Sequence, residues 1–413
     1  MDQQNEMVNP STPEVAPDPL TPAPEAEIPA TPAPEVPAEP EAPELPEPVV
    51  LYRDGITGFG FSQQGQSHIK RGTPCQDRCG LRILKNAPIV LTATADGVGR
   101  CQLSHYGAAT AVSASLDYIQ EELERWVQEP DFLFREDPRM GKLLKNAFRL
   151  ALRQVEALAE SMEQLPFLFQ STLTVSIYDG ATQTLYYGHA GDDGIVVLCD
   201  DGTYTLATAR HKGEESNSVY PLQSTETWSF GRYAKPVAAY VCVTDGVLDG
   251  FVTGANLNNR IYYPFLAEAV AHPLEGEEAV RELCRSWQDY LSGPEYRRKV
   301  RDDLTLVAVS NQTVLAKVPT PAFDPEEWEQ ALLRHREQVN RRLYPQEPPK
   351  ATEAAIPAPE NADTPPQSAE KPSRNQSLPR KPQPTAVRYV RAFFLALAEE
   401  CRHRPEEGEN SPQ

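Results

Sequence analysis

The chain has 413 residues, of which 40 are proline, and a formal net charge of −20 at pH 7. Because it is strongly acidic and has no basic stripe, we expect no nucleic-acid partner. Its 7 cysteines are odd in number and scattered, which predicts free thiols and not a disulfide framework. No signal-peptide pattern and no apolar run near the ~20 residues that span a bilayer occur, so we expect a cytoplasmic protein without a transmembrane segment.

Residues 1–50 form a compositionally distinct arm. Fourteen prolines and eleven acidic residues fall there, with no Lys or Arg. Such a segment cannot bury enough apolar surface to offset the entropy lost on ordering, so we expect a disordered, solvated arm. Residues 345–384 share the bias toward Pro, Ala, Asn and Ser and predict a disordered linker. Between them, residues 51–315 have the composition of one globular domain with a sizeable core.

Hydrophobic periodicity predicts the elements of this domain in chain order. Continuous or alternating apolar runs predict strands, and apolar residues at helical spacing predict helices. The expected elements are strands at Ile56–Ser62 and Pro88–Ala95, helices at Ser104–Trp126 and Met140–Leu165, strands at Ser171–Tyr178, Thr184–Ala190, Gly194–Cys199, Thr203–Ala207 and Val237–Thr244, helices at Tyr262–Ala271 and Glu277–Tyr290, and a strand at Leu304–Ser310. This order predicts an α+β fold, a β-sandwich flanked by helices on both faces.

Two further helices are expected after the domain. Asp324-Pro325-Glu326-Glu327 is a capping pattern that predicts a charged helix within 316–344, either packed on the domain or projecting as a spacer. Residues 385–403 contain a short amphipathic stretch with Phe393 and Phe394 at its centre. An isolated amphipathic helix usually needs a surface to bind, and its mixed charges favour a protein partner over a membrane.

Aspartates at the ends of buried runs are the strongest chemical signal. Asp-Gly pairs recur along the chain, and Asp179 is one of several in polar surroundings that fit ordinary turns. Asp96 and Asp245 differ, because each follows a buried apolar strand at the rim of the core. The glycine after each lets the backbone approach an ion and offer a carbonyl oxygen, so we predict metal ligation there. Asp302-Asp303 could equally ligate a metal or cap the last strand.

Seven short motifs place these aspartates in a wider pattern. They are GTPCQD (Gly72–Asp77), ADGVG (Ala95–Gly99), SxxGA (Ser104–Ala108), ST (Ser171-Thr172), GHAGDD (Gly188–Asp193), TDGVLD (Thr244–Asp249) and RDDLT (Arg301–Thr305). Their order and spacing resemble the metal-dependent type 2C protein phosphatases, above all the bacterial branch with a Pro-Cys-Gln-Asp signature. The resemblance covers roughly residues 55–311.

The resemblance implies a hydrolase with two Mg²⁺ or Mn²⁺ ions. Asp96, Asp245 and Asp302 would be the catalytic carboxylates, with Asp96 between the ions and the other two completing the first site. The carbonyl of Gly97 and the carboxylate of Asp77 would serve the second ion. Two such ions activate a water for attack on phosphorus without a phosphoenzyme.

Three further residues are assigned by the same resemblance. Asp192 matches an aspartate that helps to hold a third, loosely bound ion. Gln76 and Asp303 would lie behind the ligands; many relatives carry Glu at the position of Gln76, so an amide there would weaken the second site.

The chain also departs from the family pattern. Gly72 stands where relatives often carry a phosphate-binding arginine; Arg71, Lys70 or His68 could replace it. Val98 follows Asp96-Gly97, where animal members have a histidine general acid, so a proton must come from elsewhere. The stretch Ala209–Phe230 lies where the family has a mobile flap, although its sequence is equally compatible with a plain loop.

Two functions are compatible with these residues. The first is a phosphoserine/phosphothreonine protein phosphatase, whose substrates the resemblance implies to be phosphorylated targets of a bacterial Ser/Thr kinase. The alternative is a catalytically weak or silent phosphatase-like module that binds phosphoproteins or regulators. The complete set of Asp96, Asp245 and Asp302 favours the enzyme, whereas Gln76 and Gly72 favour the module.

Overall fold

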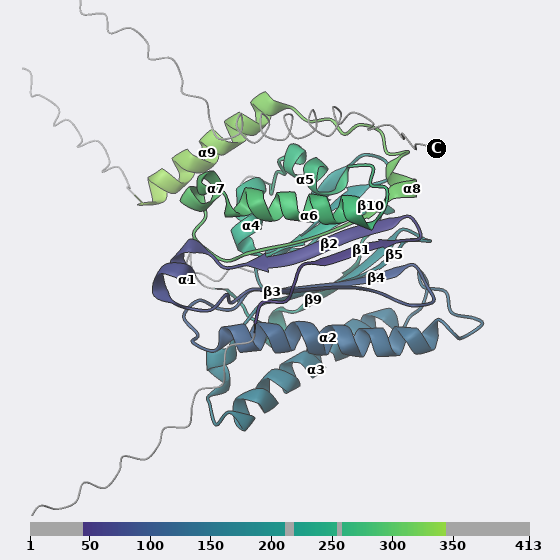
Figure 1. The fold of residues 1–413 in the computed structure, drawn as a ribbon, viewed down its shortest axis with the longest axis horizontal. Helices are drawn as coiled ribbons and strands as arrows, with labels where there is room; N and C mark the ends of the chain where they lie inside the picture. The colour runs from purple at the N-terminus through teal and green to yellow at the C-terminus, as the bar shows by residue number, and fades with distance from the viewer. Residues whose placement is uncertain (1–43, 211–218, 254–257, 344–413) are drawn as a thin grey trace, which may run out of the picture. The chain divides into compact units, whose positions relative to one another are not determined.

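The computed structural model describes residues 44–210, 219–253 and 258–343, and two antiparallel sheets form their centre (Figure 1). The first sheet has the strand order β1 (Val49–Arg53), β2 (Ile56–Gln63), β11 (Leu304–Asn311), β10 (Val237–Val243), β7 (Gly194–Cys199) and β8 (Tyr204–Leu206). The second has the order β3 (Arg78–Ile83), β4 (Ile89–Ala95), β5 (Leu173–Asp179), β6 (Thr184–Ala190) and β9 (Ser229–Arg232).

Helices cover the outer faces of both sheets, which confirms the expected α+β sandwich (Figure 1). The long helices α2 (Ser104–Trp126) and α3 (Met140–Ser161) lie against the second sheet. The first sheet is covered by α4 (Asp245–Phe251), α5 (Tyr263–Val270), α6 (Glu277–Ser292) and α9 (Pro325–Leu343). Shorter elements connect these: α1 (Gln66–Arg71), α7 (Pro294–Lys299), α8 (Gln312–Leu315) and the 3-10 turns Pro166–Phe169 and Thr225–Thr227.

Three apolar layers follow from this arrangement. Along β10, Ala239 and Val241 pack toward the helices, whereas Tyr240 and Cys242 pack between the two sheets. The same alternation occurs in β4, where Leu91 faces α2 and α3 and Val90 faces the other sheet. Successive side chains of a strand point to opposite faces, so a strand between two apolar layers must be apolar throughout. The continuous apolar runs of the sequence therefore mark the central strands.

Several elements were not predicted. β1 begins at Val49, inside the expected arm, and pairs with β2 through the two-residue turn Asp54-Gly55. Both turn residues have positive φ, 53° and 76°, as a tight type I′ hairpin requires. The stretch expected to be a flap also ends in a strand, because Ser229 and Phe230 pair with β6. The short helices α1, α4 and α7 and the strand β3 had no clear periodic signal.

The expected charged helix is α9, and it packs on the domain. The Asp324 carboxylate caps it by accepting hydrogen bonds from the N–H groups of Glu326 (2.8 Å) and Glu327 (3.2 Å). Trp328 is buried beside Tyr262, with ring centroids 5.3 Å apart. The other expected tail segments, most of 1–50, 345–384 and the helix in 385–403, lie outside the described residues. Among the helices that are described, none has the length and apolar content needed to cross a membrane.

Candidate active site

Acidic residues from five chain segments meet at one end of the sandwich, where α1 and α4 also lie (Figure 1). Arg78, the first residue of β3, pairs with Ala95, the last of β4, so Asp77 and Asp96 are neighbours. Val243 at the end of β10 pairs with Leu306 near the start of β11. That pairing brings the residues after β10 and before β11 together. Each register thus unites two motifs of one sheet, and the facing of the two sheets brings together motifs as far apart in the chain as Asp77 and Thr244.

Asp96 lies at the centre of this acidic group. Its side chain is half-buried. Burial raises the pKa of the Asp96 carboxyl well above its usual value, and neighbouring negative charges raise it further. Those charges belong to Asp77, Asp245, Asp193 and Asp302. Like charges that lie close together disfavour each other's ionised form. A bound cation would offset the charges of these five carboxylates, so this end of the protein favours cation binding.

The hydroxyl of Thr172 fixes the position of Asp96. It accepts a hydrogen bond from the Asp96 N–H at 2.7 Å and donates to Asp193 Oδ2 at 2.8 Å. The Thr172 N–H also donates to the Asp96 carbonyl oxygen at 2.7 Å. Thr172 precedes β5 and Asp193 precedes β7, so this contact joins the two sheets at the site.

Asp77 joins the sheets a second time. Its Oδ2 accepts hydrogen bonds from the hydroxyls of Thr244 (2.7 Å) and Thr305 (2.8 Å), which lie on the opposite sheet. Burial raises the pKa of Asp77 well above its usual value, and the nearby charge of Asp303 adds to the effect. Hydrogen bonds from the two threonines and one shared with Asp96 act in the opposite direction. The carboxyl is therefore held in place beside Asp96 before any ion binds.

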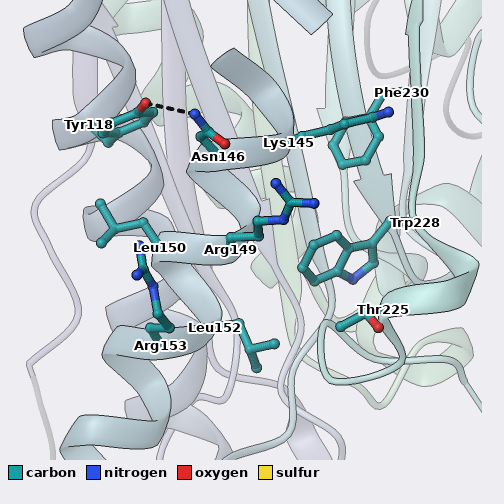
Figure 2. A pocket seen from close by; sticks show the side chains of 10 residues that line it. All are labelled: Tyr118, Lys145, Asn146, Arg149, Leu150, Leu152, Arg153, Thr225, Trp228 and Phe230. Carbon is teal, nitrogen blue, oxygen red and sulfur yellow. Dashed lines mark hydrogen bonds between the residues drawn. The ribbon is translucent and has the colours of Figure 1, made fainter. Parts of the chain in front are cut away.

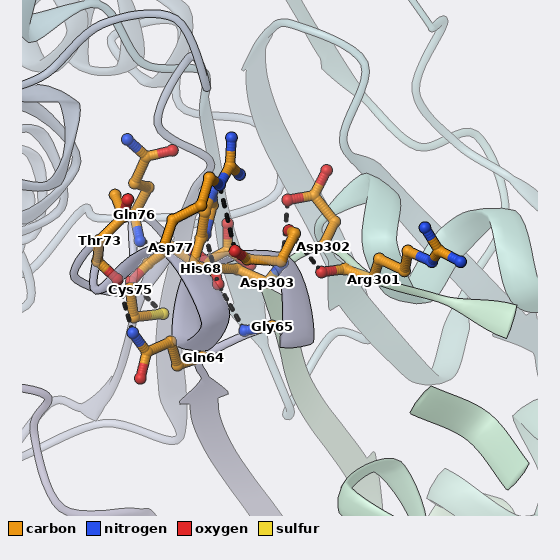
Figure 3. A network of polar contacts seen from close by, with 12 residues as sticks. Gln64, Gly65, His68, Thr73, Cys75, Gln76, Asp77, Arg301, Asp302 and Asp303 are labelled. Atoms are coloured by element: carbon orange, nitrogen blue, oxygen red, sulfur yellow. Dashed lines mark hydrogen bonds and ion pairs between the residues drawn. The ribbon is translucent and has the colours of Figure 1, made fainter. Parts of the chain in front are cut away.

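Asp303 organises the loop around α1 (Figure 3). Its two oxygens accept hydrogen bonds from the N–H groups of Gly65 and Gln76, both at 2.6 Å. His68 Nδ1 lies 2.8 Å from Asp303 Oδ1, a close contact that lacks hydrogen-bond geometry. The His68 side chain is buried, and phosphate binding by His68 stays a prediction.

Gln76 and Gly97 meet beneath the acidic group. The Gly97 N–H donates to the Gln76 carbonyl oxygen at 3.2 Å. A side chain at position 97 would begin 2.7 Å from Ser104 Oγ, so only glycine fits there. Gln76 Nε2 donates to the Cys101 carbonyl oxygen at 3.3 Å, whereas its buried Oε1 has no hydrogen-bond partner in the described structure. That oxygen is available to a ligand or a water.

Asp193 is a member of the acidic group that the sequence reasoning missed. It is fully buried, and its Oδ1 has no hydrogen-bond partner among the described residues. Burial and the charge of Asp192 raise its pKa well above the usual value. Asp192, the residue predicted for a third ion, is buried as well, and its carbonyl oxygen accepts from Arg210 Nε at 3.2 Å. The Asp-Asp pair of GHAGDD was the available signal, because two adjacent acids rarely enter a core without a role.

The geometry of Gly72 explains the missing arginine. Gly72 ends α1 with φ 66°, and its N–H bonds back to the last turn of the helix. Larger L-residues avoid this left-handed conformation, so an arginine there would strain the loop. Arg71, one residue earlier, is exposed on the last turn of α1. Phosphate binding by Arg71 stays a prediction.

The acidic group has the donor chemistry of a Mg²⁺ or Mn²⁺ site, because its ligand atoms are carboxylate, amide and carbonyl oxygens. It is not a closed cage: among the described residues no three His, Cys, Asp or Glu side chains converge on one point suited to an ion. Mg²⁺ usually keeps several waters and takes few protein ligands, which suits such an open arrangement. The residues therefore fit hydrated divalent ions.

Other cavities and the cysteines do not compete for this role. A cavity of about 980 Å³ lies between α3 and β9 and is lined by Arg149, Trp228 and other residues, none of them an aspartate (Figure 2). The cysteines in the described ranges form no disulfide. Burial raises the pKa of the Cys79 thiol to about 12, which makes it a poor metal ligand and agrees with the expected free thiols.

Comparisons with known proteins were made on this geometry. The family model described as protein phosphatase 2C matches residues 64–301. The serine/threonine-protein phosphatase 3 of Escherichia coli (strain K12) is 26% identical over 259 residues, which are 59% of this chain and 94% of the relative.

Solved structures of low identity were also found. The serine/threonine phosphatase of S. agalactiae is 16% identical, with a TM-score of 0.42 over 62% of this chain and 99% of that one. RsbX in complex with magnesium is 12% identical, with a TM-score of 0.37 over 64% of this chain and 99% of that one.

Proposed function

Because the chain belongs to the protein phosphatase 2C family and is a protein phosphatase, we propose that it hydrolyses phosphoserine and phosphothreonine with two divalent ions at the acidic end of the sandwich. The observation that supports this most directly is the position of Asp96, whose pKa is raised by burial and by four neighbouring carboxylates. The family resemblance inferred from the seven motifs is confirmed by the family model.

The proposed ligands divide between the two ions. Asp96 would contact both, Asp245 and Asp302 would complete the first, and the Gly97 carbonyl with Asp77 would serve the second. When bound, Mg²⁺ or Mn²⁺ would acidify a water for attack on phosphorus and offset the charge of the phosphate. A third ion beside Asp192 belongs to the same proposal.

The chain's own residues position these groups. Thr172 anchors the backbone of Asp96, and Thr244 with Thr305 orients Asp77, so the carboxylates need little reorganisation when an ion arrives. Arg71 would hold a phosphate oxygen. Val98 carries no proton to donate, so the leaving oxygen would take its proton from water.

The substrates would be phosphorylated proteins, including targets of a bacterial Ser/Thr kinase. We favour hydrolysis over a silent binding module, although Gln76 and Gly72 depart from the family pattern, because Asp77, Asp245 and Asp302 all lie close enough to raise the pKa of Asp96. The helix in 385–403 would recruit a protein partner, a role that does not depend on the chemistry.

Hydrolysis of p-nitrophenyl phosphate and of a phosphothreonine peptide by the full chain tests the proposal. We expect no turnover in chelator and full recovery on adding excess Mn²⁺, because the ions generate the nucleophile. Turnover that persists in chelator, or none with either Mn²⁺ or Mg²⁺, would refute the mechanism.

A further inference from the structure

A strongly cationic pocket lies between α1 and α7, close to the acidic group. Its volume is about 680 Å³. We call it the α1–α7 pocket. It is lined by Gln66, Ser67, Lys70, Arg71, Ser292, Pro294, Arg297, Arg298 and Arg301. Five are basic and none is acidic, although the whole chain has a net charge of −20. The positive charge is thus a local feature and does not reflect the average composition.

These charges are largely uncompensated. Within the described ranges Lys70, Arg71, Arg297 and Arg301 form no ion pair, and the carboxylate nearest to Arg298 is that of Glu295, at 3.7 Å. Arg297 Nε is buried and has no hydrogen-bond partner among the described residues. A buried donor without an acceptor is costly, and an anion in the pocket would supply the acceptor. Like-charged side chains gathered in one place also repel each other until an anion binds.

The pocket is anchored beside the proposed ligand Asp302. Both the N–H and the hydroxyl of Ser67 donate to the Arg301 carbonyl oxygen, at 2.9 and 2.7 Å. Arg301 directly precedes Asp302, and its side chain extends away from the Asp302 carboxylate (Figure 3). The cationic wall and the acidic group are therefore adjoining parts of one hydrogen-bonded segment.

Two of the arginines are oriented in advance. Arg71 Nε donates to the Ser67 carbonyl oxygen and Arg298 Nε to the Pro294 carbonyl oxygen, each at 3.1 Å. The bond of Arg71 uses only Nε and leaves the end of its guanidinium group for a ligand, whereas Arg298 Nη2 also lies 3.7 Å from Glu295 Oε1. A planar guanidinium can bind two oxygens of one phosphate or carboxylate, and a phosphate brings the larger negative charge.

We propose that the α1–α7 pocket binds a second phosphate of the substrate, so that the enzyme prefers peptides phosphorylated twice within a short stretch. This rests on the proposed hydrolysis at the acidic group. With Arg71 assigned to the phosphate at the acidic group, Lys70, Arg297, Arg298 and Arg301 remain for a second phosphate, which carries about two negative charges at pH 7. An extended peptide rises about 3.3 Å per residue, so peptides whose two phosphates are two to four residues apart sample separations of about 7–13 Å.

The first experiment measures binding without catalysis. A fluorescent peptide with one phosphoserine is titrated with the full chain in chelator, where the uncompensated aspartates repel phosphate and the pocket is the expected site. We expect Arg297→Gln/Arg298→Gln to weaken binding about tenfold at low salt, since an exposed ion pair contributes up to about fivefold. The matched control Arg149→Gln/Arg153→Gln removes two arginines from α3 at the other cavity and should bind like wild type. Equal binding of the peptide by both variants would refute the proposal that this pocket binds phosphate.

The second experiment measures selectivity in Mn²⁺. Phosphothreonine peptides without a second charge, with a glutamate, and with a phosphoserine two to four residues away are compared by kcat/KM. We expect kcat/KM for the doubly phosphorylated peptide to be about tenfold higher than for the peptide without a second charge, with a smaller increase for the glutamate peptide. The variant Arg297→Gln/Arg298→Gln should lose this preference. Equal kcat/KM for the three peptides with the wild-type protein would overturn the substrate assignment.

Failure of the two proposals can be told apart. An absence of turnover even on p-nitrophenyl phosphate would remove the proposed function, and the binding experiment would still decide the pocket. Duplex DNA or anionic lipid vesicles that compete as strongly as the doubly phosphorylated peptide would also overturn the assignment, because they would show that the pocket selects charge and not a phosphopeptide.

Discussion

Replacement of Thr172 by valine should destabilise the domain, because its hydroxyl satisfies two buried groups at once. The hydroxyl accepts from the Asp96 N–H and donates to Asp193 Oδ2. Valine keeps the shape and leaves both groups without this partner. An unsatisfied buried polar group costs about 1–3 kcal/mol, so we expect a loss of about 2–5 kcal/mol in the free energy of unfolding.

Thermal unfolding of the full chain measures this loss. For a domain of this size 1 kcal/mol corresponds to about 2–4 °C, so a mid-range loss of about 3 kcal/mol lowers Tm by about 6–12 °C. Thr203→Val is the matched control: its hydroxyl also donates to a carboxylate, Asp201 Oδ1 at 2.6 Å, but it is exposed. We expect that control to stay within about 0.5 kcal/mol of wild type.

Two results would refute the reasoning about Thr172. One is a Tm change no larger than that of Thr203→Val. The other is strict additivity of Thr172→Val and Asp193→Asn in a double-mutant cycle, because residues that share a buried hydrogen bond should show an interaction energy of at least about 0.5 kcal/mol.

Added Mn²⁺ should also raise Tm less in Thr172→Val than in wild type, because a displaced Asp96 would weaken ion binding.

Three further predictions concern the proposed site. Asp96→Asn and Asp245→Asn should each lower kcat by at least about 10²-fold. Asp179→Asn should match wild type, because the Asp179 carboxylate only accepts hydrogen bonds within its own turn. Equal losses of kcat in all three variants would contradict the assignment. Gln76→Glu should lower the Mn²⁺ concentration for half-maximal activity by adding charge near the second ion, and unchanged metal affinity in calorimetry would disprove this. Gly72→Arg should cost about 1–2 kcal/mol in denaturant unfolding because of its positive φ, and Gly72→Asn, which tolerates that conformation, should cost less.

The central strands could be predicted because they are apolar on both faces. β4 and β10 each lie between a helix layer and the opposite sheet, so each reads as an apolar run that ends where the core ends, interrupted in β4 by the buried Thr92 and Thr94. That is why Asp96 and Asp245 stood out from the aspartates of exposed turns. The helix α4 was missed because it has only seven residues, too few to show a 3.6-residue period, and Asp245 is its first residue.

The contacts that hold the site could not be predicted from local sequence. Thr172 meets Asp193, and Thr244 and Thr305 meet Asp77, only because the two sheets face each other. Periodicity describes the faces of one element and carries no information on which residues of another sheet lie opposite. The domain limits 51–315 stay a prediction for the same kind of reason, since composition changes gradually at both ends.

The pair Asp302-Asp303 shows how one local rule can resolve an open alternative. From the sequence, either residue could have bound a metal or supported the start of the last strand. Successive side chains near a strand point to opposite sides, so the two carboxylates cannot share one role. Asp303 is buried and accepts from the loop that carries Gly65 and Gln76, whereas Asp302 is exposed and its charge raises the pKa of Asp96. The structure thus gives Asp303 the contacts of a supporting residue, and metal binding by Asp302 stays a prediction.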